Sequence, residues 1–256
     1  MRQRGRDQLA VGHPARARRV RASDRRARAP AAFAIAPRDR YLLPRRRPSV
    51  SDRFAPSKIV CVGRNYRAHA KELGNEVPSE PLLFLKPPSA LIAHGDAIVL
   101  PRESARVEHE GELAVVIGKR ARRVRPEDVA EFIAGYTVAN DVTARDLQRK
   151  DVQFTRGKGF DTFCPVGPSI VRARPSPDAS ITVKVNGAVR QHGFLRDMVF
   201  SIDVLVAFIS DVMTLEPGDL ILTGTPEGVG PLVHGDTVEV SIDSVGTLTN
   251  TVRTEA

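Results

Sequence analysis

Short apolar runs rich in β-branched residues recur along most of the chain and narrow the choice of folds. Gly, Pro, Asn and Asp bound these runs, as is typical of strands. They lie at 58–63, 82–86, 97–100, 107–117, 136–141, 181–185, 188–190, 219–222, 237–242 and 247–252. Helical features are confined to 65–73, to a segment that Pro126 opens, and to 202–213. Many short strands with few helices predict a mainly β (α+β) fold.

Two local signals refine this prediction. Asn186-Gly187 separates two strand-like runs and predicts a hairpin with a type I′ turn. Apolar residues recur at helical spacing over 202–213, but Asp203 and Asp211 interrupt them. The segment is therefore predicted to be a core-facing helix and not a membrane span. No repeat and no second domain boundary is visible in 57–256.

The positive charge of the chain is concentrated near its beginning. The 256 residues carry a net charge of +9, but residues 1–50 hold 15 Arg and 3 Asp, a net charge of +12. Residues 51–256 hold 24 Lys or Arg and 27 Asp or Glu, a net charge of −3. Domains that bind nucleic acid usually carry a clustered basic face. We therefore expect the acidic body to bind neither nucleic acid nor membrane.

Residues 1–52 are predicted to form a leader distinct from a domain at 53–256. The leader is rich in Arg, Ala and Pro, so it buries too little apolar surface to offset its ordering entropy and is predicted to be disordered. Three interpretations stay open: a start codon assigned too far upstream, an Arg-rich transit peptide, and an arm that contacts nucleic acid or anionic membrane. Little Ser and an early Pro count against the transit peptide. No apolar segment follows the first arginines, which excludes a secretory signal.

The two cysteines, Cys61 and Cys164, lie far apart and in no metal-ligand spacing. This usage is typical of core thiols in a reducing compartment, and we expect a cytoplasmic protein.

Three acidic residues give the first indication of chemistry. Glu110 and Glu112 lie two apart in the run 107–117, so a continuous strand places them on one face. Asp141 closes the run 136–141. Three carboxylates that meet repel one another and need a cation, and hard oxygen ligands favour Mg²⁺ or Mn²⁺ over Zn²⁺. The alternative is a pair of solvated glutamates produced by ordinary strand alternation, with an aspartate at a turn.

A second candidate is the pair His69 and Glu72. Their spacing of three makes them neighbours on a helix. A carboxylate beside an imidazole orients its tautomer and raises its basicity, which suits the activation of water. The alternative is an exposed charged pair on a surface helix. His109, beside the first glutamate, is a candidate supporting residue or a base at the rim of the site.

Two glycine-rich stretches are candidates for binding an anion. Lys158 lies between Gly157 and Gly159, where the backbone permits close approach and the lysine can reach a bound anion; the alternative is a solvated loop lysine. The segment 223–231 lacks the Gly-Lys-Ser/Thr ending of a P-loop, and no GxGxxG motif is present, so a nucleotide site is not predicted. Its N–H groups and hydroxyls suit a carboxylate.

Taken in order, these segments resemble the fumarylacetoacetate hydrolase superfamily, and the small single-domain acylpyruvase-like members are the most similar. The resemblance covers about 58–252 and leaves the leader out. It is carried by seven blocks: 62–66, His69 with Glu72, 83–87, 109–113, 141–146, 158–161 and 222–230.

The resemblance implies a mixed β-sandwich roll of the fumarylacetoacetate hydrolase C-terminal type with a few short helices, assembled as a homodimer. It assigns Glu110, Glu112 and Asp141 as ligands of Mg²⁺ or Mn²⁺, His69, Glu72 and Lys158 as catalytic residues, and Arg64, Gln148 and Thr225 as substrate-binding residues.

The implied activity is metal-dependent hydrolysis of the C–C bond of acylpyruvate-like 2,4-dioxo acids, which yields pyruvate and a carboxylic acid. The alternatives are isomerisation of 2-hydroxyhepta-2,4-diene-1,7-dioate, decarboxylation of aromatic meta-cleavage intermediates, and decarboxylation of oxaloacetate, which needs no attacking water. Because His69 and Glu72 are both present, the prediction favours hydrolysis. The stretch between Gln148 and Lys158 is shorter than in acylpyruvases, so the sequence does not determine which acyl group the enzyme prefers. A non-enzymatic alternative is a tether that acts through the leader.

Overall fold

The computed structural model describes residues 55–255, which belong to one compact unit. The predicted leader at 1–52 lies outside the described residues. Strands make up 41% of the structure, which confirms the mainly β (α+β) prediction. No helix among residues 55–255 is long and apolar enough to cross a membrane.

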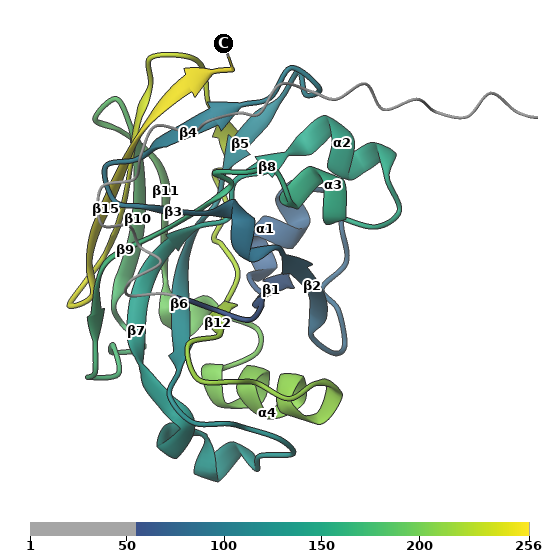
Figure 1. The fold of residues 1–256 in the computed structure, drawn as a ribbon, viewed down its shortest axis with the longest axis vertical. Coiled ribbons are helices and arrows are strands. Elements are labelled where there is room, and N and C mark those ends of the chain that lie inside the picture. Colours follow the sequence, from purple (N-terminus) through teal and green to yellow (C-terminus); the bar gives the residue numbers. More distant parts are fainter. Residues whose placement is uncertain (1–54, 256) are drawn as a thin grey trace, which may run out of the picture. The chain divides into compact units, whose positions relative to one another are not determined.

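Three sheets organise the described residues (Figure 1). The largest has the order β2-β1-β12-β6-β7-β9-β3, with bounds β1 Ile59–Gly63, β2 Leu82–Lys86, β3 Leu91–Ala93, β6 Gly111–Ile117, β7 Ile133–Asn140, β9 Cys164–Val171 and β12 Leu220–Leu222. The second has the order β11-β10-β14-β15-β4, with bounds β4 Ala97–Leu100, β10 Ser180–Val185, β11 Ala188–Phe194, β14 Thr237–Ile242 and β15 Gly246–Thr254. The third has the order β13-β5-β8, with bounds β5 Val107–His109, β8 Thr143–Ala144 and β13 Gly230–Pro231.

The helices are short and lie mostly away from the five-stranded sheet. Figure 1 shows α1, α2 and α3 on the side of β1 and β2, and α4 near the end of β12. Their bounds are α1 Arg67–Glu72, α2 Arg145–Lys150, α3 Thr155–Lys158 and α4 Ile202–Val212, with 3-10 turns η2 Pro88–Ala90, η3 Pro126–Phe132 and η4 Leu195–Asp197. The segment that Pro126 opens is thus a 3-10 helix.

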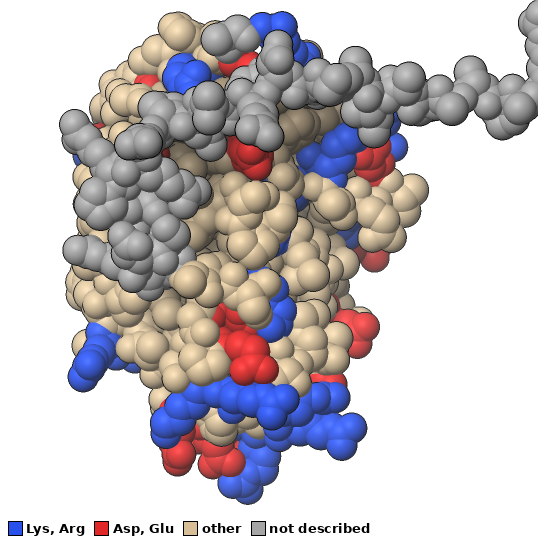
Figure 2. All heavy atoms as spheres, in the orientation of Figure 1, with Lys and Arg blue, Asp and Glu red and all other residues tan. Residues whose placement is uncertain are grey.

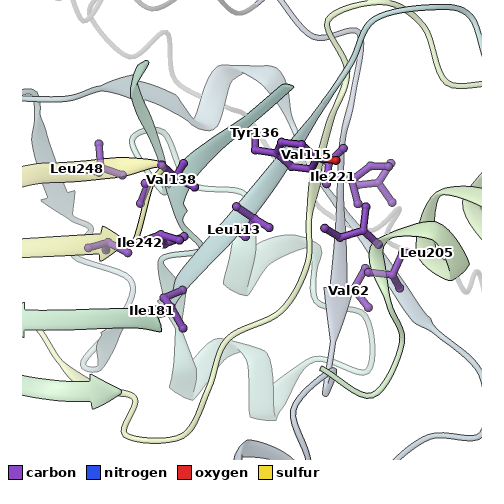
Figure 3. Packing of buried hydrophobic residues seen from close by; sticks show 14 of the residues in the cluster. Val62, Leu113, Val115, Tyr136, Val138, Ile181, Leu205, Ile221, Ile242 and Leu248 are labelled. Atoms are coloured by element: carbon purple, nitrogen blue, oxygen red, sulfur yellow. The ribbon is translucent and has the colours of Figure 1, made fainter. Parts of the chain in front are cut away.

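The main core lies between the two large sheets. Alternate residues of β10 and β14 point inward, as the period of two requires, and pack against β6 and β7. Figure 3 shows Leu113 and Val138 of the larger sheet beside Ile181, Ile242 and Leu248 of the five-stranded sheet. Burial of these faces is the main force that holds the two sheets together.

A second, smaller core fills the other face of the seven-stranded sheet. It contains Ala114, Ala139 and the two thiols, Cys61 and Cys164. Both cysteines are buried and free, which confirms their prediction as core residues. A sheet buried on both faces explains why its strands read as nearly continuous apolar runs.

The hairpin prediction is confirmed, and one strand prediction needs correction. Asn186 and Gly187 both have positive φ, at 52° and 80°, as a type I′ turn requires. The run 107–117 was predicted as one strand, but it is divided between β5 and β6, which belong to different sheets. Glu110 lies between them, where its N–H donates to the Asn140 side chain. The change of sheet follows from the strands with which each half pairs, β8 and β13 for β5 and β7 and β12 for β6, and the sequence of the run alone does not show these partners.

The charges on the face drawn in Figure 2 are mixed, with basic and acidic side chains next to one another. Among the ion pairs at the surface, Arg125 contacts Asp128 and Arg174 contacts Asp203. Such exposed pairs stabilise a fold only slightly.

One buried carboxylate fixes the parallel pairing of β1 and β12. Asp219 is fully buried and accepts hydrogen bonds from the Ser57 N–H (2.9 Å), the Ser57 hydroxyl (2.7 Å) and the Lys58 N–H (3.1 Å). Its second oxygen accepts from Lys58 Nζ (2.5 Å) and the Glu216 N–H (2.8 Å). Burial alone raises the pKa of Asp219, but these hydrogen bonds outweigh burial and lower the pKa.

We expect Asp219→Asn to lower the free energy of unfolding by about 2–4 kcal/mol at neutral pH, because an amide cannot replace an anion that accepts five hydrogen bonds. The lowered folded-state pKa stabilises the protein above the unfolded-state pKa, and this contribution is lost as pH falls through the folded-state pKa. Urea unfolding at neutral and acidic pH therefore shows a difference between wild type and variant that shrinks in acid. The control is Asp243→Asn, since Asp243 is exposed and its carboxylate accepts hydrogen bonds from the N–H and the hydroxyl of Ser180. An equal loss in both variants would show that the hydrogen bonds to the buried Asp219 carboxylate do not stabilise the fold.

Candidate active site

Three buried carboxylates meet where β5 passes into β6 and where β7 ends. Glu110 precedes β6, Glu112 is on β6, and Asp141 follows β7. The antiparallel pairing of Gly111 with Asn140 brings the two segments together. One oxygen from each carboxylate lies within 4.8 Å of the others, and all three residues are buried. The structure therefore brings the three predicted ligands together, and the alternative of a solvated glutamate pair is wrong.

Glu110 and Asp141 are compensated by buried cations. Lys158 Nζ donates to Glu110 Oε2 (2.8 Å) and to Asp141 Oδ2 (2.7 Å), and Lys86 Nζ donates to Asp141 Oδ1 (2.6 Å). Arg145 donates to the other oxygen of Glu110. Burial raises the pKa of Glu110, but the charges of Lys158 and Arg145 outweigh burial and hold the pKa well below its usual range. Glu110 is therefore ionised at neutral pH.

Glu112 has a different environment. Its Oε2 accepts from the Gly224 N–H at 2.6 Å, and no cation among residues 55–255 donates a hydrogen bond to it. Burial, followed by the negative charges of Asp141 and Glu110, raises its pKa well above the usual value. Glu112 is thus the ligand candidate whose charge is least compensated by the chain itself.

This donor set fits a hard divalent cation. It offers carboxylate oxygens from Glu110, Glu112 and Asp141, at the wall of a cavity that leaves room for further ligands. Oxygen ligands of this kind suit Mg²⁺ and Mn²⁺. A cation here would also supply the positive charge that Glu112 lacks.

The predicted lysine is buried, contrary to the alternative of a solvated loop residue. Burial lowers the pKa of Lys158, but the charges of Asp141 and Glu110 outweigh this effect and raise the pKa, so the ammonium group stays protonated. The flanking glycines allow α3 to pack closely. A Cβ on Gly157 would lie 2.9 Å from the Gln148 nitrogen, and a Cβ on Gly159 would lie 2.6 Å from the Thr155 carbonyl oxygen.

His69 and Glu72 form a hydrogen-bonded pair on α1. His69 Nδ1 lies 3.2 Å from Glu72 Oε2, and the other oxygen of Glu72 accepts from the Gly228 N–H at 3.0 Å. His69 is only 5% exposed, so the alternative of an exposed surface pair is wrong for the histidine. A neutral ring that donates from Nδ1 keeps Nε2 free to accept a proton.

A buried glutamine, Gln191 on β11, holds the glycine-rich loop in place. Its Nε2 donates to Thr225 Oγ1 (2.8 Å) and to the Pro226 carbonyl (2.7 Å), and its Oε1 accepts from the Gly111 N–H (3.1 Å). Thr225 Oγ1 in turn donates to the Gly111 carbonyl (2.7 Å). The Thr225 hydroxyl has therefore committed its only proton, and it can offer a substrate only a lone pair.

His109 belongs to this network and not to the cavity wall. Its Nδ1 lies 3.0 Å from Gln191 Oε1, which makes it the donor. Burial lowers the pKa of His109, which favours the neutral ring. The structure supports its interpretation as a supporting residue and not as a base at the rim.

The carboxylates open into a cavity of about 240 Å³. Of the nine residues predicted for the site, eight line this cavity, namely Arg64, His69, Glu110, Glu112, Asp141, Gln148, Lys158 and Thr225. Glu72 contacts His69 but does not line the cavity. Phe84 and Phe154 add an apolar wall, with ring centroids 5.6 Å apart, and Lys158 Nζ lies 4.9 Å from the Phe84 centroid.

Sequence reasoning missed the cations that support the acidic cluster. Lys86 ends β2 and also donates to the Val142 carbonyl (3.0 Å). Arg145 donates to Glu108 Oε2 (2.6 Å) and Gln148 Oε1 (2.5 Å) as well as to Glu110. Both residues lie in segments that carry the family resemblance. A single Lys or Arg at the end of an apolar strand is nevertheless predicted to be exposed, because these residues are rarely buried without a partner.

The arrangement defines a class of protein in which a buried triad of carboxylates, a shared lysine and a histidine–glutamate pair face a small cavity. Residues 58–253 match the family model described as fumarylacetoacetate (FAA) hydrolase C-terminal. The chain belongs to this family, a family of enzymes, which confirms the resemblance drawn from the seven blocks.

Individual relatives differ in the reactions that their names describe. Oxaloacetate tautomerase FAHD1, mitochondrial, of Arabidopsis thaliana is 48% identical over 193 residues, which cover 73% of this chain and 86% of the relative. The structure of 5-carboxymethyl-2-hydroxymuconate delta-isomerase from Mycobacterium smegmatis is 50% identical, with a TM-score of 0.75 over 79% of this chain and 81% of that chain. The structure of fumarylpyruvate hydrolase from Pseudomonas aeruginosa, in complex with Mn²⁺ and pyruvate, is 34% identical. Its TM-score is 0.74, over 79% of this chain and 91% of that chain.

Proposed function

We propose that the chain is a Mg²⁺- or Mn²⁺-dependent isomerase that interconverts the keto and enol forms of a short 2-oxo dicarboxylic acid, with oxaloacetate as the first substrate to test. The observation that carries this proposal is the small cavity in which Glu110, Glu112 and Asp141 lie beside Lys158 and His69. The names of the relatives support it, since the tautomerase and the isomerase are 48% and 50% identical and the hydrolase is 34% identical.

Each side chain has a definite task in this reaction. A cation held by the three carboxylates would supply Lewis-acid polarisation of the 2-keto group. His69 Nε2 takes a proton from C3 of the keto form, while Glu72 stabilises the resulting imidazolium through Nδ1. Lys158 donates a hydrogen bond to the oxygen on which negative charge develops. That oxygen then gains a proton. The reaction therefore moves one proton from C3 to the 2-oxygen and leaves the composition and the charge of the substrate unchanged.

The acylpyruvase reaction is the second candidate, and the His69–Glu72 pair favours it. In that reaction His69 takes a proton from water, which adds to the carbonyl at C4. The C3–C4 bond breaks, its electron pair stays on C3, and protonation of C3 gives pyruvate and a carboxylic acid. Both reactions need the same stabilisation of an enolate, and they differ in whether water attacks.

His69→Ala tests the base that both candidates share, and the rates of wild type on the two substrates separate the candidates. We expect the variant to lose at least about 100-fold in the enol-to-keto conversion of oxaloacetate, because the group that accepts the C3 proton in one direction and returns it to C3 in the other is gone. The conversion is followed by the decay of enol absorbance, and pyruvate release from acetylpyruvate and from oxaloacetate is measured in parallel. The control is His192→Ala, since His192 is exposed and contacts Thr182 outside the cavity.

If wild type releases pyruvate from acetylpyruvate faster than it converts enol-oxaloacetate, the protein is a hydrolase and not an isomerase. If His69→Ala converts enol-oxaloacetate at the wild-type rate, the assigned base is wrong.

A further inference from the structure

The cations of the cavity fall into two groups. Lys158 and Arg145 both contact carboxylates of the acidic cluster. Arg64 and Arg149 also line the cavity, but neither forms an ion pair with any acidic residue in 55–255. A guanidinium that faces a cavity without an acidic partner is available to a ligand.

Helix α2 sets the distance between these two groups. Arg145 and Arg149 are four residues apart, so they lie on the same helix face, together with Gln148. Four residues correspond to about 6 Å along the helix axis. Arg145 is buried beside Glu110, whereas Arg149 is exposed at the other end of the helix, and both line the cavity. The face therefore runs from the floor of the cavity to its mouth.

We propose that Arg149 determines substrate specificity by binding the second carboxylate of a dicarboxylic substrate, while the first carboxylate and the 2-keto oxygen lie at the acidic cluster. The proposal rests on the function proposed above for its substrate class. The floor of the cavity already pairs Lys158 and Arg145 with Glu110, so a second substrate charge needs a cation that is still unpaired. Of the two unpaired cations, Arg64 is partly buried, whereas Arg149 is exposed at the far end of the helix face that Arg145 begins. Arg149 offers a planar, bidentate donor for that purpose.

The test compares two ligands that differ only at one end. The terminal group of 2-oxoglutarate is a carboxylate, and that of 2-oxopentanoate is a methyl group. Both ligands are titrated into the Mg²⁺-loaded full chain by calorimetry. Arg149→Gln is expected to weaken the affinity for 2-oxoglutarate about tenfold or more and to change the affinity for 2-oxopentanoate less than about twofold. Arg149→Lys keeps the charge and is expected to recover part of the loss.

Lys150→Gln is the matched control. Lys150 occupies the same last turn of α2 and is exposed, but it does not line the cavity, so neither ligand is expected to change. Equal effects of Arg149→Gln on both ligands, no effect on either, or a wild type that does not prefer 2-oxoglutarate would each overturn the proposal.

A second readout keeps this proposal apart from the proposed function. Exchange of the C3 protons of oxaloacetate, followed by NMR, is expected to show a raised KM in Arg149→Gln with little change in kcat. Oxaloacetate exchange that is unaffected by Arg149→Gln would overturn the second-carboxylate site and leave the isomerase standing. Arg149-dependent binding without any exchange would refute the isomerase and support the site.

Discussion

Replacing Glu112 by Gln is expected to lower turnover by at least about 100-fold and to abolish binding of Mg²⁺. Loss of a residue that only supports a metal ligand typically lowers metal affinity or activity about 10- to 100-fold, and loss of a ligand itself lowers them further. The fold should be retained. Burial, Asp141 and Glu110 raise the pKa of Glu112, so its ionised form destabilises the metal-free protein as pH rises above the unfolded-state pKa. The neutral amide removes this cost, and metal-free E112Q should be at least as stable as metal-free wild type.

Thermal unfolding with and without Mg²⁺ measures both effects. Bound metal raises the Tm of wild type, and the Tm of E112Q should not respond. Glu110→Gln is a poorer test, since it leaves Arg145 and Lys158 without their shared acceptor. Glu131→Gln, at an exposed position, is the control for loss of a carboxylate. Retained Mg²⁺ binding by E112Q would show that the triad is not the metal site.

Replacing Lys158 by Met is expected to affect stability and activity together. The change leaves Glu110 and Asp141 without the ammonium group that bridges them, and breaking a buried pair of this kind typically costs about 3–5 kcal/mol. Turnover should fall by at least about 100-fold, because the donor to the developing oxyanion is lost. Urea unfolding and steady-state kinetics measure the two effects.

The metal dependence of K158M tests this explanation. A divalent cation at the carboxylates supplies part of the missing positive charge, so the loss of stability should shrink when Mg²⁺ is present. Lys150→Met removes an exposed lysine nearby and should leave stability and turnover unchanged. Wild-type stability of metal-free K158M would contradict the ion-pair network.

The parts of the site that the sequence predicted depend on short-range rules. The closeness of Glu110 and Glu112 in sequence and the place of Asp141 at the end of a strand grouped the three carboxylates, although Glu110 lies just before β6 and not on one continuous strand with Glu112. Helix spacing paired His69 with Glu72. These rules act within one element or between two adjacent strands, and a single chain displays them directly.

The parts that were missed depend on contacts between distant elements. Gln191 reaches His109 and Thr225 across more than thirty residues of sequence, and nothing in its own strand distinguishes it. Strand β9 was not predicted, since Pro165 and Pro168 are unusual inside a strand. The separation of β5 from β6 likewise follows from which sheet each strand joins, and alternation alone does not encode that choice.

We propose that the chain is a metal-dependent isomerase of a 2-oxo dicarboxylic acid, and one assay tests this activity directly. The most direct measurement is the rate at which freshly dissolved enol-oxaloacetate becomes the keto form with the purified protein and Mg²⁺, with pyruvate release recorded in the same sample. Mg²⁺ alone and E112Q with Mg²⁺ are the references. We expect the protein to accelerate the conversion over both references, to lose this acceleration when the metal is chelated, and to release pyruvate much more slowly than it tautomerises oxaloacetate. A rate equal to that of Mg²⁺ alone would contradict this proposal.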